Sequence, residues 1–241
     1  MLCGRIGLPQ STGSTSVELS LVLGPMKSGK SLDLIAQMAP LAYSRLSCAV
    51  VQSARHVRDA RIVSRTGASV PTVKLDTLEP LLHTTEDVVA IDEVHMFTPG
   101  DVRVVEELVL RGTRVLACGI DLDHRGELFA TIRALLELGP TEVRYRRAVC
   151  DRCQDLHAAF TQVLSDGLPF LDPLGASEPL PDDGTFTYEA LCRRCFVLPE
   201  TAIVTGSAST SRPQRSAQAR APEPDDAAGS TPTASDPARL G

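Results

Sequence analysis

The stretch "VLGPMKSGKSL", residues 22–32, determines how the rest of the chain is interpreted. Its central part, Gly24–Ser31, fits the pattern G-x-x-x-x-G-K-[ST], which binds phosphate when a strand precedes it and a helix follows it. The apolar run "VELSLVLG" (17–24) precedes it, and "SLDLIAQMAPLAYSR" (31–45) follows with helical spacing. We therefore expect a phosphate-binding loop between a buried strand and a helix that Pro40 kinks or shortens.

Each residue type in this loop has a physical role in binding phosphate. Gly24 and Gly29 let the backbone curl so that its N–H groups point at phosphate oxygens, and the helix adds its positive N-terminal end. Lys30 would reach the β- and γ-phosphates of ATP, and Ser31 would offer its hydroxyl to Mg²⁺. The candidate nucleotide-binding residues are Gly24, Pro25, Met26, Lys27, Ser28, Gly29, Lys30 and Ser31. The alternative is a chance glycine-rich turn, which the flanking strand and helix disfavour.

A second apolar run, "VVAIDE" (88–93), ends in two adjacent carboxylates. In a phosphate-loop protein, Asp92 at this position would serve the magnesium ion. Glu93 would take a proton from an attacking hydroxyl group or water molecule. The pair therefore predicts a kinase or an ATPase, and the alternative is a solvated acid at the end of a strand.

Apolar strand-like runs alternate with helical patterns, which predicts an α/β fold with a parallel sheet covered on both faces. We expect further strands at 48–53 and 113–121, and one or two strand pieces around Gly67 within 61–75. Further helices are expected at 99–112, with Pro at the start and Gly at the end, and at 126–139.

Composition divides the chain further and limits its partners. Residues 206–241 contain few large apolar residues and predict a disordered tail, and residues 1–15 predict a flexible extension. Residues 16–144 would form the ATP-binding domain, and 145–200 a smaller second unit. The net charge of −6 makes nucleic acid an unlikely main partner. The sequence has no apolar run of about 18 residues and no apolar signal segment, so we expect no membrane span and a cytoplasmic location.

Four of the seven cysteines form two C-x-x-C pairs, Cys150 with Cys153 and Cys192 with Cys195. Two such pairs in a reducing compartment suit a closed, structural, tetrahedral Zn²⁺ site. The alternative is two unrelated pairs, one or both redox-active. Cys48 and Cys118 lie in apolar runs and are expected to be small core residues.

Taken together, "GPMKSGKS", "IDEVHMF", "GIDLDHRGELF" and "YEALCRRC" resemble the type II thymidine kinases over about residues 17–196. The resemblance implies a RecA-like P-loop domain, a small zinc domain and a "lasso" loop between the cysteine pairs that closes over the nucleoside. It also implies a homotetramer that uses Mg²⁺ to transfer the γ-phosphate of ATP to the 5′-hydroxyl of thymidine or deoxyuridine, giving dTMP from thymidine.

The resemblance also assigns roles to individual residues. Glu93 matches the general base, and Asp92 the residue that serves the magnesium site. Arg58 and His95 fall at family positions on the ATP side. The positions matching the nucleoside site are His124, Thr161, Gly184 and Tyr188.

Several positions depart from the family pattern, and most of them fall in the nucleoside pocket. They are His56, His95, Met96, His124, Leu128 and Val163. These departures keep two alternatives open: a non-catalytic nucleotide-binding protein and, less favoured, a zinc-ribbon ATPase that acts on nucleic acid. Three of the six positions are histidines, which could suggest a second metal site, but their spacing favours unrelated substitutions.

Overall fold

The structure is a computed structural model, and it describes residues 18–57, 61–64, 67–171, 179–180 and 183–198. All of these residues belong to one compact unit. The predicted N-terminal extension and tail, and the candidate residue Arg58, lie outside the described residues. The division at residue 144 into an ATP-binding domain and a smaller unit stays a prediction.

A six-stranded parallel sheet forms the centre of the fold, with the order β5-β2-β6-β7-β1-β8. Its strands are β1 (Leu19–Leu23), β2 (Cys48–Ser53), β5 (Val73–Leu75), β6 (Val88–Asp92), β7 (Arg114–Gly119) and β8 (Glu142–Tyr145). The predicted α/β class with a parallel sheet is confirmed. The phosphate loop follows β1, the acidic pair follows β6, and β7 lies between these two strands.

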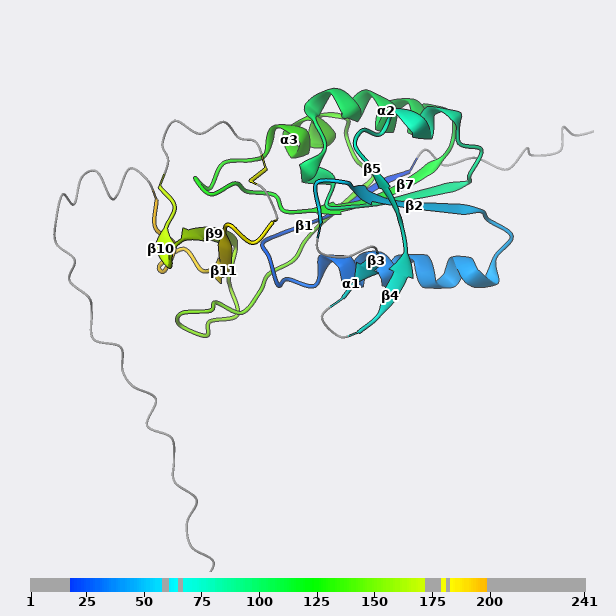
Figure 1. The fold of residues 1–241 in the computed structure, drawn as a ribbon. Helices are drawn as coiled ribbons and strands as arrows, with labels where there is room; N and C mark the ends of the chain where they lie inside the picture. The colour runs from blue at the N-terminus through cyan, green and yellow to red at the C-terminus, as the bar shows by residue number, and fades with distance from the viewer. Residues whose placement is uncertain (1–17, 58–60, 65–66, 172–178, 181–182, 199–241) are drawn as a thin grey trace, which may run out of the picture. The chain divides into compact units, whose positions relative to one another are not determined.

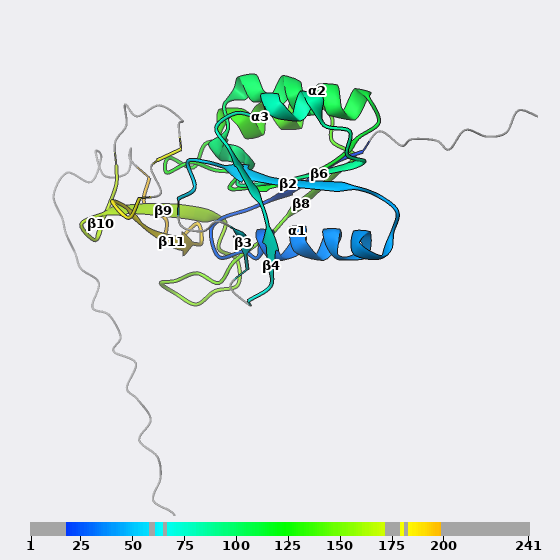
Figure 2. The same cartoon turned by 45° about the vertical axis from the view of Figure 1, so that its right-hand side comes forward.

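Helices cover both faces of this sheet, as Figures 1 and 2 show. Helix α1 (Lys30–Met38) lies on one face, and α2 (Val102–Leu110) and α3 (Ala130–Glu137) lie on the other. Each face has its own apolar core: Leu34 and Met38 of α1 pack in one, and Leu108 and Ile132 in the other. Successive strand residues alternate between the two cores, as expected for a sheet buried on both sides.

Short 3₁₀ helices connect the main elements: η1 (Ala39–Tyr43), η2 (Glu79–His83), η3 (Val94–Met96) and η4 (Pro99–Asp101). The helix predicted over 31–45 is α-helical only to Met38, and η1 follows with Pro40 near its start. Proline lacks the N–H that an α-helix interior needs, so the predicted break is confirmed. The predicted helix at 99–112 likewise begins as η4 before α2.

Two parts of the sheet differ from the expectation. Residues 61–75 form three short strands: β3 (Arg61–Val63) pairs with β4 (Ser69–Pro71), and β5 joins the main sheet. Strand β8 was not predicted, because its sequence "EVRY" is charged and lacks an apolar run. It pairs with β1 at the edge of the sheet, and its four residues are exposed or half-buried.

A three-stranded antiparallel sheet follows, in the order β10-β9-β11. Its strands are β9 (Phe160–Ser165), β10 (Leu168–Pro169) and β11 (Thr187–Leu191). Ala158, Leu191 and Phe196 form a small core beside it together with cysteines of both C-x-x-C pairs. Among the described residues, no helix is both long and apolar enough to cross a membrane.

Candidate active site

The loop Gly24–Ser31 has the curled backbone that its sequence predicts. Gly24, Lys27 and Gly29 have φ angles of +147°, +64° and +83°. A Cβ atom on Gly24 would lie 2.4 Å from the backbone oxygen of Arg146, so only glycine fits there. Lys30 is buried, and its ammonium group donates to the carbonyl oxygen of Pro25 at 2.8 Å. The cation is therefore folded over the loop that would hold phosphate.

The carboxylate of Asp92, at the end of β6, faces the start of α1. Ser31 Oγ donates to Asp92 Oδ1 at 3.3 Å, Gln52 Nε2 to Oδ2 at 3.1 Å, and Cys118 Sγ to Oδ1 at 2.8 Å. Burial raises the pKa of Asp92, while these hydrogen bonds from Cys118 and Ser31 and the charge of Lys30 act to lower it. A hydroxyl and a carboxylate beside a phosphate loop are the oxygen ligands that Mg²⁺ prefers, so these residues fit that ion.

Glu93 has an uncommon conformation for a residue other than glycine. Its φ angle is +51°, in the left-handed region, where the chain turns from β6 into η3. Among the described residues, the buried oxygen Oε2 has no hydrogen-bond partner, and His95 Nδ1 lies 3.5 Å from it. A strained backbone and an unsatisfied buried acceptor at the same residue indicate a functional site.

His95 lies behind Glu93 and is almost fully buried. Its Nδ1 accepts a hydrogen bond from the backbone N–H of Ile120 at 3.3 Å, so the neutral ring carries its proton on Nε2. The pKa of His95 is lowered to about 4, mainly by burial and also by the charges of Lys30 and His56, while the charge of Glu93 acts to raise it. The ring packs on Phe129, with 5.0 Å between the ring centroids. His95 is therefore a neutral, fixed neighbour of Glu93.

Two cavities meet at Glu93. The phosphate-side cavity has a volume of about 460 Å³. Four of its lining residues also line the second cavity, and the others are Lys27, Gly29, Lys30, Ser31, Leu32, Gln52, Arg61, Val63, Ser64 and Asp92. The acceptor cavity, about 80 Å³, is lined by His95, Met96, Leu122, Asp123, His124, Phe129, Thr161, Val163, Pro179, Leu180 and Tyr188 together with the shared residues. The shared residues are Met26, His56, Glu93 and Ile120. The carboxylate of Glu93 is thus the acidic group common to both cavities.

The candidate nucleoside residues come together in the acceptor cavity, with one exception. Thr161 Oγ1 accepts a hydrogen bond from the backbone N–H of Met26 at 3.0 Å, which joins β9 to the phosphate loop. Tyr188 lines the cavity from β11. His124 lines it too and packs against Phe170, with 5.2 Å between ring centroids. Gly184 is exposed, with a φ angle of +93°, and lines neither cavity.

The three histidines of the departing positions, His56, His95 and His124, all line the acceptor cavity. Within the described part of the chain, the four cysteines are the one set of three or more His, Cys, Asp or Glu side chains close enough together to hold a metal ion. The arrangement therefore gives no support to a second metal site among the histidines.

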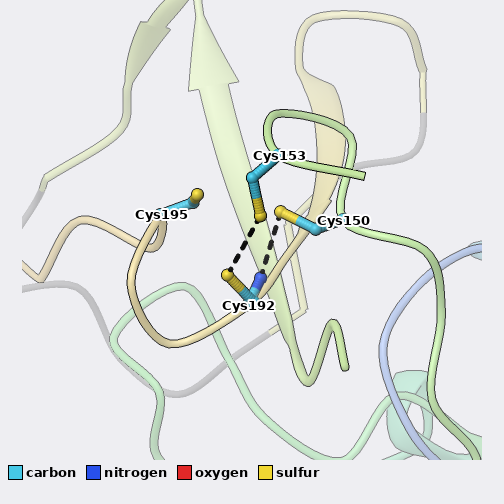
Figure 3. A group of neighbouring side chains, drawn as sticks. All are labelled: Cys150, Cys153, Cys192 and Cys195. Carbon is cyan, nitrogen blue, oxygen red and sulfur yellow. Dashed lines mark hydrogen bonds between the residues drawn. The ribbon is translucent and has the colours of Figure 1, made fainter. Parts of the chain in front are cut away.

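The four cysteines do come together, as Figure 3 shows. Their sulfur atoms all lie within 4.8 Å of one another, and Cys153 Sγ lies 3.6 Å from Cys192 Sγ. A tetrahedral Zn²⁺ with Zn–S bonds of about 2.3 Å separates its sulfurs by roughly 3.8 Å, so the four thiols fit this ion. Although burial opposes it, backbone N–H groups of Cys153, Cys192 and Arg152 lower the pKa of Cys150 to about 6.

One carboxylate links the cysteine group to the phosphate loop. Asp151 lies inside the first C-x-x-C pair, and its Oδ2 accepts from Lys27 Nζ at 2.7 Å and from the backbone N–H of Ala190 at 2.6 Å.

The chain has only three lysines, and Lys74, the third, donates to Gln52 Oε1 at 2.6 Å. All three side-chain amines therefore lie at the candidate site or one side chain behind it.

Sequence reasoning missed the contacts of Gln52 and Cys118 with Asp92. Gln52 could have been found, because it is a polar residue near the end of an apolar strand, as Asp92 is in β6. Cys118 is a core residue as predicted, but nothing in its apolar run signals a bond to a carboxylate.

Comparison with known protein families agrees with this geometry. The family model described as thymidine kinase matches residues 17–196, which include the phosphate loop, the acidic pair and all four clustered cysteines. The chain belongs to the thymidine kinase family.

Proposed function

We propose that this protein is an ATP-dependent deoxynucleoside kinase that phosphorylates the 5′-hydroxyl of thymidine or deoxyuridine. The observation that carries the proposal is the position of Glu93, whose side chain borders both the phosphate-side cavity and the acceptor cavity. In phosphoryl transfer the acceptor hydroxyl meets the donor phosphate, and the general base that takes the hydroxyl proton lies where the two meet. Family membership supports a kinase, and the choice of thymidine rests on the resemblance of the motifs.

The residues of the loop divide the work of binding the donor. The backbone N–H groups of the loop hold the phosphates of ATP, and Lys30 turns from the Pro25 carbonyl to the γ-phosphate. Ser31 and Asp92 would hold Mg²⁺, which when bound neutralises charge on the β- and γ-phosphates. The backbone N–H dipoles of the loop and the ammonium group of Lys30 stabilise the negative charge that develops on the γ-phosphoryl group during transfer.

Glu93 acts on the acceptor. Its carboxylate, which borders both cavities, accepts the proton of the 5′-hydroxyl as the hydroxyl oxygen forms a bond to the γ-phosphorus. The bond between this phosphorus and the β-phosphate oxygen breaks, and ADP leaves. His95 stays neutral at neutral pH. Its Nδ1 therefore carries no proton to donate to Glu93, and the ring does not compete with Glu93 for the proton of the 5′-hydroxyl.

Purified Glu93→Gln tests this role in an assay with ATP, Mg²⁺ and thymidine. Replacing a general base is expected to lower kcat by about 10²–10⁴-fold, while ATP binding is retained. Glu106→Gln is the matched control, because Glu106 is exposed on α2 and lines neither cavity. A Glu93→Gln enzyme with nearly the kcat of the wild type would remove Glu93 from the mechanism.

A second candidate function is a nucleotide-binding protein without kinase activity. It is favoured by the small acceptor cavity, where Met96, His124 and Val163 stand at the departing positions. Thermal-shift titration separates the two: ATP should stabilise either protein, and thymidine only the kinase. The homotetramer and the cytoplasmic location implied by the resemblance stay predictions.

A further inference from the structure

Polar side chains form a row across four neighbouring strands of the main sheet. Lys74 on β5 is in register with Gln52 on β2, and Gln52 is in register with Asp92 on β6. Cys118 on β7, the next strand, bonds to Asp92. We call these four residues the polar ladder.

The polar ladder lies on the face of the sheet that α1 covers. Val88 and Ala90 of β6 pack in the core with α1, and Asp92 continues the same alternation. Leu116 of β7 packs in that core as well, and Cys118 follows it. The row therefore meets the first turn of α1 at Asp92, to which Ser31 donates a hydrogen bond.

The hydrogen bonds of the polar ladder run in one direction. Lys74 Nζ donates to Gln52 Oε1 at 2.6 Å, and Gln52 Nε2 donates to Asp92 Oδ2 at 3.1 Å. An ammonium group can only donate and a carboxylate can only accept, so one orientation of the Gln52 amide satisfies both neighbours. Lys74 therefore determines which way this amide faces.

The contacts of Asp92 make this orientation matter. Gln52 Nε2 donates to Oδ2, while Ser31 and Cys118 donate to Oδ1. Without Gln52, the buried Oδ2 would lose this hydrogen bond, and the carboxylate would turn towards the remaining donors. One of these is the hydroxyl of Ser31, the other group that fits the metal ion.

We propose that Gln52 and Lys74 are positioning residues for the metal ion of the phosphoryl-transfer site, because they hold the Asp92 carboxylate in one orientation. The proposal rests on the proposed function. Lys74 also donates to the carbonyl oxygen of His56 at 2.6 Å, which fixes the chain after β2 where it borders both cavities. Groups that orient a metal ligand commonly change metal affinity when they are replaced.

Binding of Mn²⁺ in the presence of ADP, followed by electron paramagnetic resonance, tests the proposal on the full-length protein. Gln52→Met and Lys74→Met are each expected to weaken Mn²⁺ binding by about 10- to 100-fold, and to weaken metal-free ADP binding much less. The double variant should bind Mn²⁺ about as weakly as Gln52→Met alone, because Lys74 acts on the metal site through Gln52. Lys74→Arg keeps a donor and should retain most of the affinity.

Arg114→Met is the matched control for the loss of a cation. Arg114 begins β7 in the same sheet, pairs with Glu18 at 2.7 Å and lies outside the polar ladder. It should bind Mn²⁺ as the wild type does.

Two results would overturn the polar ladder as a positioning device. One is wild-type Mn²⁺ affinity in Gln52→Met and Lys74→Met while Asp92→Asn loses the ion. The other is an equal loss of metal-free ADP binding, which would mean that the substitutions disturb the fold. A wild-type protein that binds Mn²⁺ with ADP but phosphorylates no nucleoside would refute the proposed function, and the Mn²⁺ affinities would still decide the role of the polar ladder.

Discussion

The buried His95 should make the protein lose stability as the pH falls below neutral. In the unfolded chain a histidine has a pKa near 6.5, and in the folded protein burial lowers the pKa of His95 to about 4. The folded-state pKa is the lower one, so the unfolded chain takes up a proton first. The stability is fully present above pH 6.5 and is lost as the pH falls towards 4. The shift corresponds to about 3 kcal/mol in all, of which about 2 kcal/mol is lost by pH 5.

His95→Gln removes the titrating group but keeps an acceptor for the backbone N–H of Ile120. Urea unfolding at pH 7.5 and pH 5 measures the effect as the change in the free energy of unfolding. We expect the wild type to lose about 2 kcal/mol more than His95→Gln over this range. Carboxylates titrate in both proteins, so their contribution cancels in the comparison.

His157→Gln is the matched control, because the side chain of His157 is 83% exposed. Its pH dependence should follow that of the wild type. Equal losses of stability in the wild type and in His95→Gln would refute the reasoning, since the ring would then be protonated as easily in the folded protein as in the unfolded chain.

Two further predictions concern the phosphate loop and the cysteine group. Gly24→Ala should destabilise the protein by about 2–4 kcal/mol in urea unfolding, because its Cβ would lie 2.4 Å from the Arg146 oxygen. Gly139→Ala, also at positive φ but with nothing within 4 Å, should cost only about 1–2 kcal/mol, and an equal or greater cost for Gly139→Ala would contradict the steric explanation. Zinc removal by a chelator should abolish thymidine binding before ATP binding in thermal-shift titrations, because β9 and β11 carry Thr161 and Tyr188 while the phosphate loop follows β1. Simultaneous loss of both ligands would mean that the metal supports the whole fold.

The parts of the fold that the sequence predicts well are those where one strong local signal acts alone. Glycines at fixed spacing predicted the curl of the phosphate loop, and Pro40 predicted the end of α1. The apolar run of β6 predicted a buried strand ending at Asp92. In each case the signal is a backbone restriction or a run of buried residues, and both are local properties.

The missed features depend on pairing between distant segments. Strand β8 is charged and exists because β1 offers it a partner 122 residues earlier, as the bond between Leu19 and Thr141 illustrates. The polar ladder was missed because the register of three separate strands is needed to bring Lys74, Gln52 and Asp92 together. The unsatisfied oxygen of Glu93 was also beyond sequence reasoning, although its acidic character was evident.

The distribution of lysine has a consequence for handling the protein. Lys27 and Lys30 line the phosphate-side cavity, and Lys74 lies behind Gln52 at its edge. Two of the three side-chain amines in the chain therefore line the cavity that would hold a nucleotide, and the third lies one side chain away. Activated esters, aldehyde crosslinkers and amine-coupled biosensor surfaces would attach to this site or to the α-amino group. A sensor built by random amine coupling would measure a population partly blocked at its own binding site, whereas attachment through an added terminal tag would leave it open.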